Sequence, residues 1–280
     1  MEPSEELEKD ALAQEPFPPT HSTLDEPQQR ASLDDRRLAN REVGSSLADQ
    51  EIAGDAIFAL AEDGRVDLGD GLDDRITVKS EGHIATISGV VDSAGERMAT
   101  EEMVEAIPSV ELVENALTVS VDSYLDDENL AQLVRERLDT SGFAWVGSRV
   151  SHGVVRLVGT AEKLSDEERA IRVAAGVKGT RDVVSNMKVR MPEYTDAIDL
   201  LSLITQGLAL NDIVVLDREV AVSEDGHVRI SGKVQSLRDR RRIRRIIADI
   251  PGVRAIKDNL RVDHALFHDW QARTHLSTGR

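Results

Sequence analysis

The chain has 280 residues, of which 40% are hydrophobic but only 3% aromatic, no cysteine, and a formal net charge of −18. This length allows two or three compact domains, whose cores must be built mainly from Val, Ile, Leu and Ala. The lack of cysteine excludes disulfides, thiolate metal sites and a Cys nucleophile, and so negative a charge excludes nucleic-acid binding along the whole chain.

The first segment, residues 1–46, is rich in Glu, Asp, Pro, Gln and Ser. Its few large apolar residues cannot offset the entropy cost of ordering, so we expect a disordered acidic arm. The first 19 residues hold no apolar run and therefore do not resemble a secretory signal peptide. No stretch reaches the ~18 consecutive apolar residues of a membrane span. We therefore expect a cytoplasmic chain without a transmembrane segment.

From about residue 47 the sequence repeats itself three times. Each copy contains a glycine, and apolar residues follow this glycine at intervals of 18, 28 and 30 residues. The three glycines are Gly89, Gly159 and Gly232. Three matching registers predict one domain present in three copies. The expected domains are 47–122, 125–191 and 194–263, followed by a tail, 264–280.

Each copy has the same physical pattern. Two alternating polar and apolar runs flank a glycine-containing turn, which is typical of a β-hairpin. A helical apolar stripe follows, such as Ile243, Ile246, Ile247 and Ile250, and then another alternating strand. A further amphipathic helix precedes each hairpin. The predicted fold is α/β (α+β): three α-β-β-α-β domains, each with a three-stranded mixed sheet and two helices on one face. The first copy has one additional residue between Gly82 and Gly89, which predicts a β-bulge.

Candidate chemical sites are few. The sequence has no GxSxG, GxGxxG or HExxH motif, so we expect no enzymatic activity. An acidic loop only loosely resembles a calcium loop, because it lacks the closing Glu; it contains Asp67, Asp70, Asp73 and Asp74. His264 and His268 would share one helical face, but no third ligand accompanies them. We therefore predict neither a metal site nor a cofactor.

The basic segment 238–245 contains six arginines in eight positions. On a helix whose apolar stripe faces the sheet, four of them share the outer surface: Arg238, Arg241, Arg242 and Arg245. Arg240 and Arg244 flank this surface. Arginines early in a helix oppose its dipole, so helix stability does not explain them. An anionic partner could.

Three kinds of partner compete for these arginines. One is an acidic protein surface, either on another copy of the chain, which would give self-association, or on the matching helix of the first repeat; that helix carries Glu101, Glu102 and Glu105. Another is an anionic phospholipid surface, near which each arginine gains about 1 kcal/mol. Nucleic acid is the least favoured partner, because no aromatic platform accompanies the arginines.

The three copies, residues ~47–262, resemble the BON family, a domain found in osmotically induced and nodulation proteins of bacteria, and the third copy matches it most specifically. The resemblance rests on a G-h-V-x-h-x-G hairpin from Gly226 to Gly232, an I-P-G-V step with Gly252, and a closing V-x-N-x-h-x-V. That closing motif contains Asn186 in the second copy and Asn259 in the third. We expect a structural role at turns and strand ends for Gly89, Gly159, Gly226, Gly232, Gly252, Asn186 and Asn259.

The resemblance implies a non-enzymatic binding module associated with phospholipid surfaces, envelope integrity and osmotic stress. We therefore expect a tandem BON-domain adaptor that associates with anionic surfaces through Arg238, Arg241, Arg242, Arg244 and Arg245. The alternative is a cytoplasmic sensor of a small cation, because some cytoplasmic members of the family bind potassium.

Overall fold

The computed structural model describes residues 47–62, 66, 75–120, 126–192, 196–211 and 213–263. Several expectations from the sequence concern residues outside this part of the chain. These are the arm 1–46, the loop with Asp67, Asp70, Asp73 and Asp74, and the tail 264–280 with His264 and His268.

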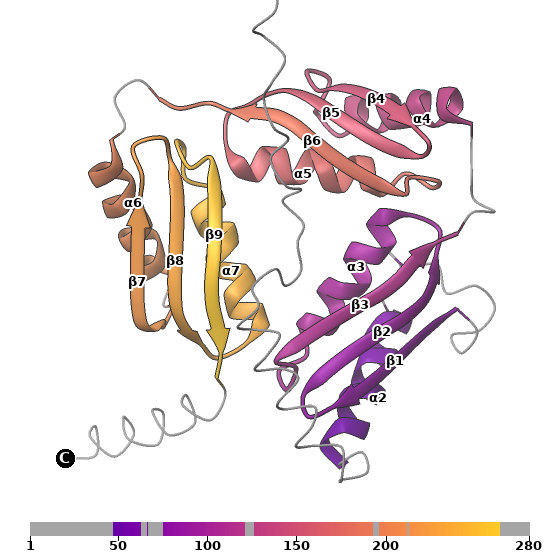
Figure 1. The fold of residues 1–280 in the computed structure, drawn as a ribbon, viewed down its shortest axis with the longest axis horizontal. Helices are drawn as coiled ribbons and strands as arrows, with labels where there is room; N and C mark the ends of the chain where they lie inside the picture. The colour runs from indigo at the N-terminus through magenta and orange to yellow at the C-terminus, as the bar shows by residue number, and fades with distance from the viewer. Residues whose placement is uncertain are drawn as a thin grey trace, which may run out of the picture. The chain divides into compact units, whose positions relative to one another are not determined.

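One arrangement occurs three times: a helix, a two-stranded hairpin, a second helix and a third strand (Figure 1). The first repeat consists of α2 (Leu47–Glu62), β1 (Ile76–Glu81), β2 (Ile84–Val91), α3 (Ala94–Glu105) and β3 (Leu112–Val119). The second consists of α4 (Asp127–Thr140), β4 (Gly147–Ser151), β5 (Val154–Ala161), α5 (Leu164–Ala175) and β6 (Asp182–Val189). The third consists of α6 (Ala197–Leu210), β7 (Leu216–Val222), β8 (His227–Val234), α7 (Leu237–Ala248) and β9 (Ala255–Val262). The predicted α-β-β-α-β order is confirmed.

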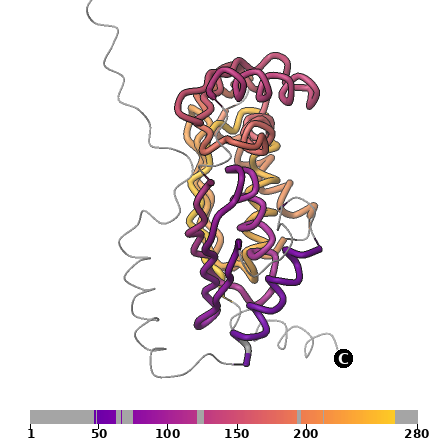
Figure 2. The backbone as a smooth tube through the Cα atoms, turned by 90° about the vertical axis from the view of Figure 1, so that its right-hand side faces the viewer, coloured from indigo at the N-terminus to yellow at the C-terminus, as the bar shows by residue number. Residues whose placement is uncertain are grey.

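Each repeat has a sheet of three strands, with the second strand of the hairpin at its centre. In the third repeat, β8 pairs antiparallel with β7 and parallel with β9. A parallel pair needs a crossover connection, which α7 supplies. In the first repeat, α2 and α3 lie on the same side of the sheet (Figure 2). The mixed sheet and the helices on one face are thus as predicted.

The predicted bulge in the first hairpin is wrong. Glu81 pairs directly with Ile84, and the strands keep one register up to the pair Ile76 and Gly89. The turn residues Gly82 and His83 both have positive φ, 58° and 67°, as a two-residue type I′ turn requires. The second repeat makes the same turn with His152 and Gly153, so the glycine occupies the other turn position and no residue is added. A register shift occurs instead in the third repeat, between Leu216 and Glu219.

The start and the packing of α7 follow from local sequence. The Ser236 hydroxyl accepts a hydrogen bond from the backbone N–H of Asp239 at 3.1 Å, which caps the helix. The stripe that follows is buried: Ile243 and Ile247 have no exposed surface, and Ile246 is partly buried. Burying such a side chain contributes roughly 1.5–3 kcal/mol. The apolar stripe therefore fixes which face of α7 its arginines occupy.

Candidate functional site

Three arginines of α7 are closely paired with acidic side chains, and a fourth, Arg245, forms a longer ion pair. Within the third repeat, Arg240 Nε lies 2.8 Å from Asp258 Oδ2 on β9. Arg244 reaches the second repeat, where its Nη2 lies 2.7 Å from Glu168 Oε1 on α5. The third, Arg241, reaches the first repeat. These three arginines are therefore engaged within the chain.

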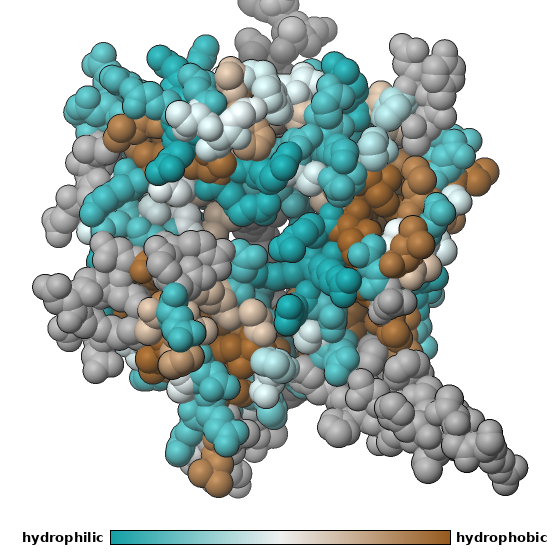
Figure 3. All heavy atoms as spheres, turned by 180° about the vertical axis from the view of Figure 1, so that it is seen from behind, coloured by the Kyte–Doolittle hydropathy of each residue, from teal (hydrophilic) through white to brown (hydrophobic). Residues whose placement is uncertain are grey.

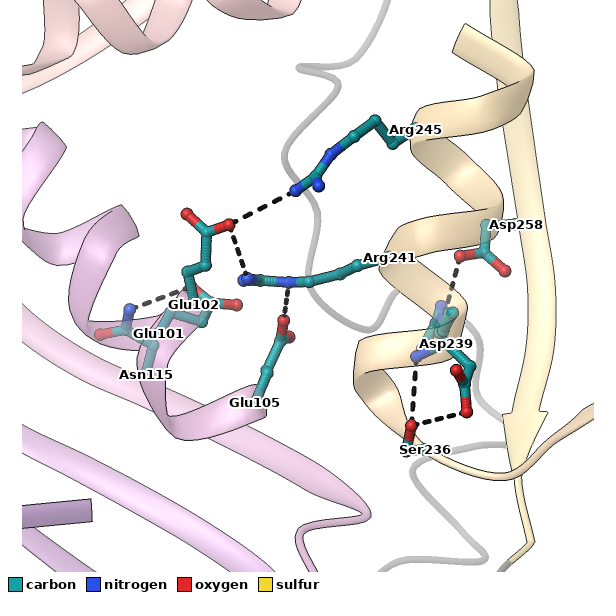
Figure 4. Close-up of polar contacts among 10 residues, drawn as sticks. Glu101, Glu102, Glu105, Asn115, Ser236, Asp239, Arg241, Arg245 and Asp258 are labelled. Carbon is teal, nitrogen blue, oxygen red and sulfur yellow. Dashed lines mark hydrogen bonds and ion pairs between the residues drawn. The ribbon is translucent and has the colours of Figure 1, made fainter. Parts of the chain in front are cut away.

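Arg241 makes the most extensive of these contacts (Figure 4). Its Nη1 lies 3.3 Å from Glu102 Oε1, and its Nε pairs with Glu105. Both glutamates come from α3, the matching helix of the first repeat. The third glutamate of that helix, Glu101, accepts a hydrogen bond from Asn115 instead.

Burial dominates the electrostatics at Glu105. Burial raises the pKa of its carboxyl above the ordinary value, and the positive charge of Arg241 only partly offsets this effect. The nearby charge of Glu101 raises the pKa further. Glu105 thus gains its charged partner at a desolvation cost, as is usual for a half-buried ion pair.

The other three arginines remain accessible. The side chain of Arg245 is 74% exposed, and its Nη2 lies 3.8 Å from Glu102 Oε1. Arg238 and Arg242 are also exposed, and neither forms an ion pair within the described ranges. The four arginines predicted to share the outer surface therefore do not all have the same surroundings. Arg241 is directed at another repeat, whereas Arg238, Arg242 and Arg245 are exposed, and of these three only Arg245 also pairs with the described residues of that repeat. We call Arg238, Arg242 and Arg245 the exposed arginine face.

An apolar surface lies beside this face, on α6. Its exposed large side chains are Ile198, Leu201, Leu203 and Leu210. Figure 3 shows hydrophobic side chains gathered over the third repeat, on the right-hand side of that view. Ile246 of α7 packs close to Gly207 of α6, and Arg242 lies one turn before Ile246 on the same side of α7. Arg242, one member of the exposed arginine face, therefore lies on the side of α7 that packs against α6.

The matching helix of the second repeat, α4, shows that the fold does not require this apolar surface. Both helices bury three residues at the same spacing: Leu130, Val134 and Leu138 in α4, and Leu200, Ile204 and Leu208 in α6. With this register, exposed α4 positions carry Glu128, Arg135, Glu136 and Asp139, and the corresponding α6 positions carry Ile198, Thr205, Gln206 and Ala209. The only charged residue of α6 is Asp199. An uncharged outer helix face is thus particular to the third repeat.

The motif glycines all have positive φ. In the central strands the values are 136° for Gly89, 149° for Gly159 and 141° for Gly232, and in the third repeat they are 80° for Gly226 and 97° for Gly252. The last two approach each other closely, since a Cβ on Gly226 would lie 2.2 Å from the carbonyl oxygen of Gly252. Only a residue without a Cβ fits there.

Among the described residues, the residue just before each motif asparagine forms side-chain hydrogen bonds, whereas the asparagine itself does not. This residue was not predicted from the sequence. Asn186 and Asn259 form no side-chain hydrogen bond within the described part of the chain. The residue just before each, and its counterpart in the first repeat, accepts a bond from the backbone N–H two residues later. These bonds are Leu117 N to Asn115 (3.1 Å), Met187 N to Ser185 (3.2 Å) and Leu260 N to Asp258 (2.9 Å).

The same side chains tie the last strand to the second helix of each repeat. Their helix partners are Glu101 for Asn115, Glu167 for Ser185 and Arg240 for Asp258. Each residue thus joins strand and helix through one polar contact. Three different residue types share this role, so no residue identity could reveal it in the sequence.

These features define a class of protein: a tandem array of three small α-β-β-α-β domains, with a basic helix in an otherwise acidic chain. The BON domain model matches residues 48–120, 126–191 and 204–264, and the chain therefore belongs to the BON domain family. Within the described residues, no helix is both long enough and apolar enough to span a bilayer.

Known proteins resemble parts of the chain. Osmotically-inducible protein Y of Escherichia coli (strain K12) is 27% identical over 150 residues, which cover 50% of this chain and 75% of that protein. Among solved structures, CdsD, a structural protein of the Type III secretion system of Chlamydia trachomatis, aligns with 80% of this chain and 98% of its own, with 15% identity and a TM-score of 0.22. Its C-terminal domain aligns with 76% and 96%, with 13% identity and a TM-score of 0.20. TM-scores this low support no inference about fold or function.

Proposed function

We propose that this chain is a cytoplasmic, non-enzymatic adaptor that associates with anionic surfaces, foremost phospholipid membranes, in a stress- or envelope-related role. The observation that carries the proposal is the exposed arginine face of α7 beside the uncharged apolar surface of α6. The name of the related Osmotically-inducible protein Y favours a role in osmotic stress.

The two surfaces suit a membrane interface in different ways. Arginines near an anionic leaflet gain about 1 kcal/mol each, so the three of the exposed arginine face supply about 3 kcal/mol, or roughly 100-fold in affinity. Exposed apolar side chains such as Ile198 and Leu210 can enter the boundary between headgroups and acyl chains. An interfacial helix needs both contributions, because neither alone gives firm attachment.

The first repeat provides an internal competitor for two of the arginines. Glu102 and Glu105 engage Arg241, and Glu102 also lies near Arg245. Carboxylates and lipid phosphates offer the same kind of acceptor to a guanidinium. Without an external anion, Arg238 and Arg242 are accessible, Arg245 is partly accessible, and Arg241 is paired with the glutamates of α3.

Vesicle flotation tests the proposal with the full chain. We expect the wild type to float with vesicles that contain anionic phosphatidylglycerol but not with neutral phosphatidylcholine vesicles, and raised salt to weaken the binding. Neutralising the exposed arginine face (R238Q, R242Q and R245Q together) should lower affinity roughly 100-fold, by the estimate of about 1 kcal/mol for each charge.

The matched control neutralises three exposed arginines on the strands of the same repeat: R218Q, R229Q and R261Q. Both triple variants lose the same net charge, so a difference between them isolates the role of the α7 surface. Binding that is equal for anionic and neutral vesicles, or equal for the two variants, would overturn the membrane proposal.

A further inference from the structure

One structural position, the first residue of the second helix, takes part in each contact between the repeats. Ala94, Leu164 and Leu237 each stand five residues after the central-strand glycine of their repeat and begin its second helix. All three are buried, but not in the core of their own repeat. Ala94 packs in the core of the second repeat, Leu164 in that of the third, and Leu237 in that of the first.

These contacts form a head-to-tail cycle. The first repeat inserts its residue into the second, the second into the third, and the third into the first. Such a contact is heterologous, because each repeat offers an inserted side chain on one surface and a receiving core on another. The contact from the third repeat to the first closes the cycle, and we call it the closing joint.

Hydrogen bonds and ion pairs strengthen the joints between repeats that are neighbours in the sequence. Between the first and second repeats, Ala94 N donates to Thr180 O at 2.8 Å, and Gly179 N donates to Asp92 O at 3.1 Å. Between the second and third, Lys163 Nζ lies 3.0 Å from Asp249 Oδ1. These joints are also favoured because short connections, 120–126 and 190–196, keep the repeats together.

The closing joint joins residues from opposite ends of the described chain. It combines the buried Leu237 with the ion pairs of Arg241 and Arg245 to Glu102 and Glu105. No direct connection links these surfaces, because the third repeat is joined covalently only to the second. That connection contains Pro192, which disfavours helical backbone at Met191.

We propose that the third repeat exchanges between two copies of this chain, so that the closing joint also forms between copies. The third repeat of one copy then occupies the position of the third repeat in the other, and every joint described above is re-formed. Only the relation between the second and third repeats of one chain changes. Within one chain the effective concentration is of the order of mM, so the closed monomer prevails in dilute solution and the exchanged dimer grows as the protein approaches mM concentrations.

Two full-length variants with reversed charges test the exchange. The first carries R241E and R245E, and the second carries E102R and E105R. Each variant places like charges at its own closing joint, which opens that joint. In an exchanged pair, acids of one copy always meet arginines of the other at both closing joints. We expect each variant alone to be a monomer of 30.7 kDa, and their equimolar mixture to form a 1:1 complex of twice that mass in native mass spectrometry.

The control carries R238E and R242E, which change the same helix and the same net charge but leave Arg241 and Arg245 in place. Mixed with the E102R and E105R variant, it should give no complex. A mixture of the two test variants that remains monomeric, while each keeps the circular dichroism spectrum of the wild type, overturns the proposal. If a double variant fails to fold, the single variants R241E and E105R repeat the test. A wild type that stays monomeric into the mM range overturns it equally.

Discussion

Truncating Leu237 should loosen the first repeat, although the residue belongs to the third. Its side chain is 4% exposed and lies in the core formed by side chains of α2, α3 and the first sheet. Leu→Ala changes in cores typically cost about 2–5 kcal/mol. Because Leu237 lies where two repeats meet and its surroundings can partly close, we expect the lower end, about 2 kcal/mol. Lowering the free energy of local opening of the first repeat by about 2 kcal/mol raises the population of its open state about 30-fold.

Hydrogen exchange followed by mass spectrometry locates this effect in the chain. For Leu237→Ala we expect about 30-fold faster exchange of protected amides in α3 and in the first sheet, since exchange follows local opening. Ile204→Ala is the matched control: it lies in the same repeat and has no exposed surface, but it packs in the core of the third repeat. Its effect should stay in the third repeat. If the two variants accelerate the same peptides, Leu237 does not join the repeats.

Three further predictions concern stability and are read from thermal or denaturant unfolding. Gly226→Ala should destabilise the fold by at least about 1–3 kcal/mol, the usual cost of a strained φ, because φ of Gly226 is 80° and the added Cβ meets the Gly252 carbonyl. Gly54→Ala on α2 should instead stabilise it by about 0.5–1 kcal/mol, because the added Cβ meets free space. Glu105 has a folded-state pKa above its unfolded value, so its contribution is present below the unfolded pKa and is lost as pH rises through the folded pKa. The melting temperature of Glu105→Gln relative to wild type should therefore rise between pH 4 and pH 7, and a constant difference contradicts this. Asp258→Ala leaves the Leu260 amide and Arg240 without their acceptor and should cost about 1–3 kcal/mol; an unchanged midpoint shows that water replaces the carboxylate.

The fold could be predicted because its signals are local and occur three times. The stripe that contains Ile243 and Ile247 is a property of one helix, and these residues are buried as the period indicates. The hairpin was harder, because the glycine can occupy either position of the same two-residue turn. Alignment of Gly82 with Gly153 therefore suggested an additional residue that the strand register excludes.

The candidate site could be predicted only in part, because contacts between repeats are long-range. The helical pattern placed Arg241 on the side of α7 away from the core, but nothing local indicates that α3 of the first repeat lies there. Glu102 and Glu105 precede Arg241 by more than 130 residues. The apolar surface of α6 was not predicted, for another reason. A buried stripe is enough to explain the apolar residues of α6 in the sequence. Only comparison with α4 shows that the outer face of α6 lacks charged residues.

The most direct test of the central claim is the affinity of full-length Glu102→Gln/Glu105→Gln for anionic vesicles. The claim is that an external anionic surface and the acids of α3 compete for the same arginines. Releasing Arg241 and Arg245 should therefore tighten binding by up to about 2 kcal/mol, or roughly 30-fold. Glu51→Gln/Glu62→Gln, on the exposed side of α2, removes the same charge away from α7 and controls for the net charge of the chain. We expect tighter binding for the first pair than for the control. Equal or weaker binding would contradict the account.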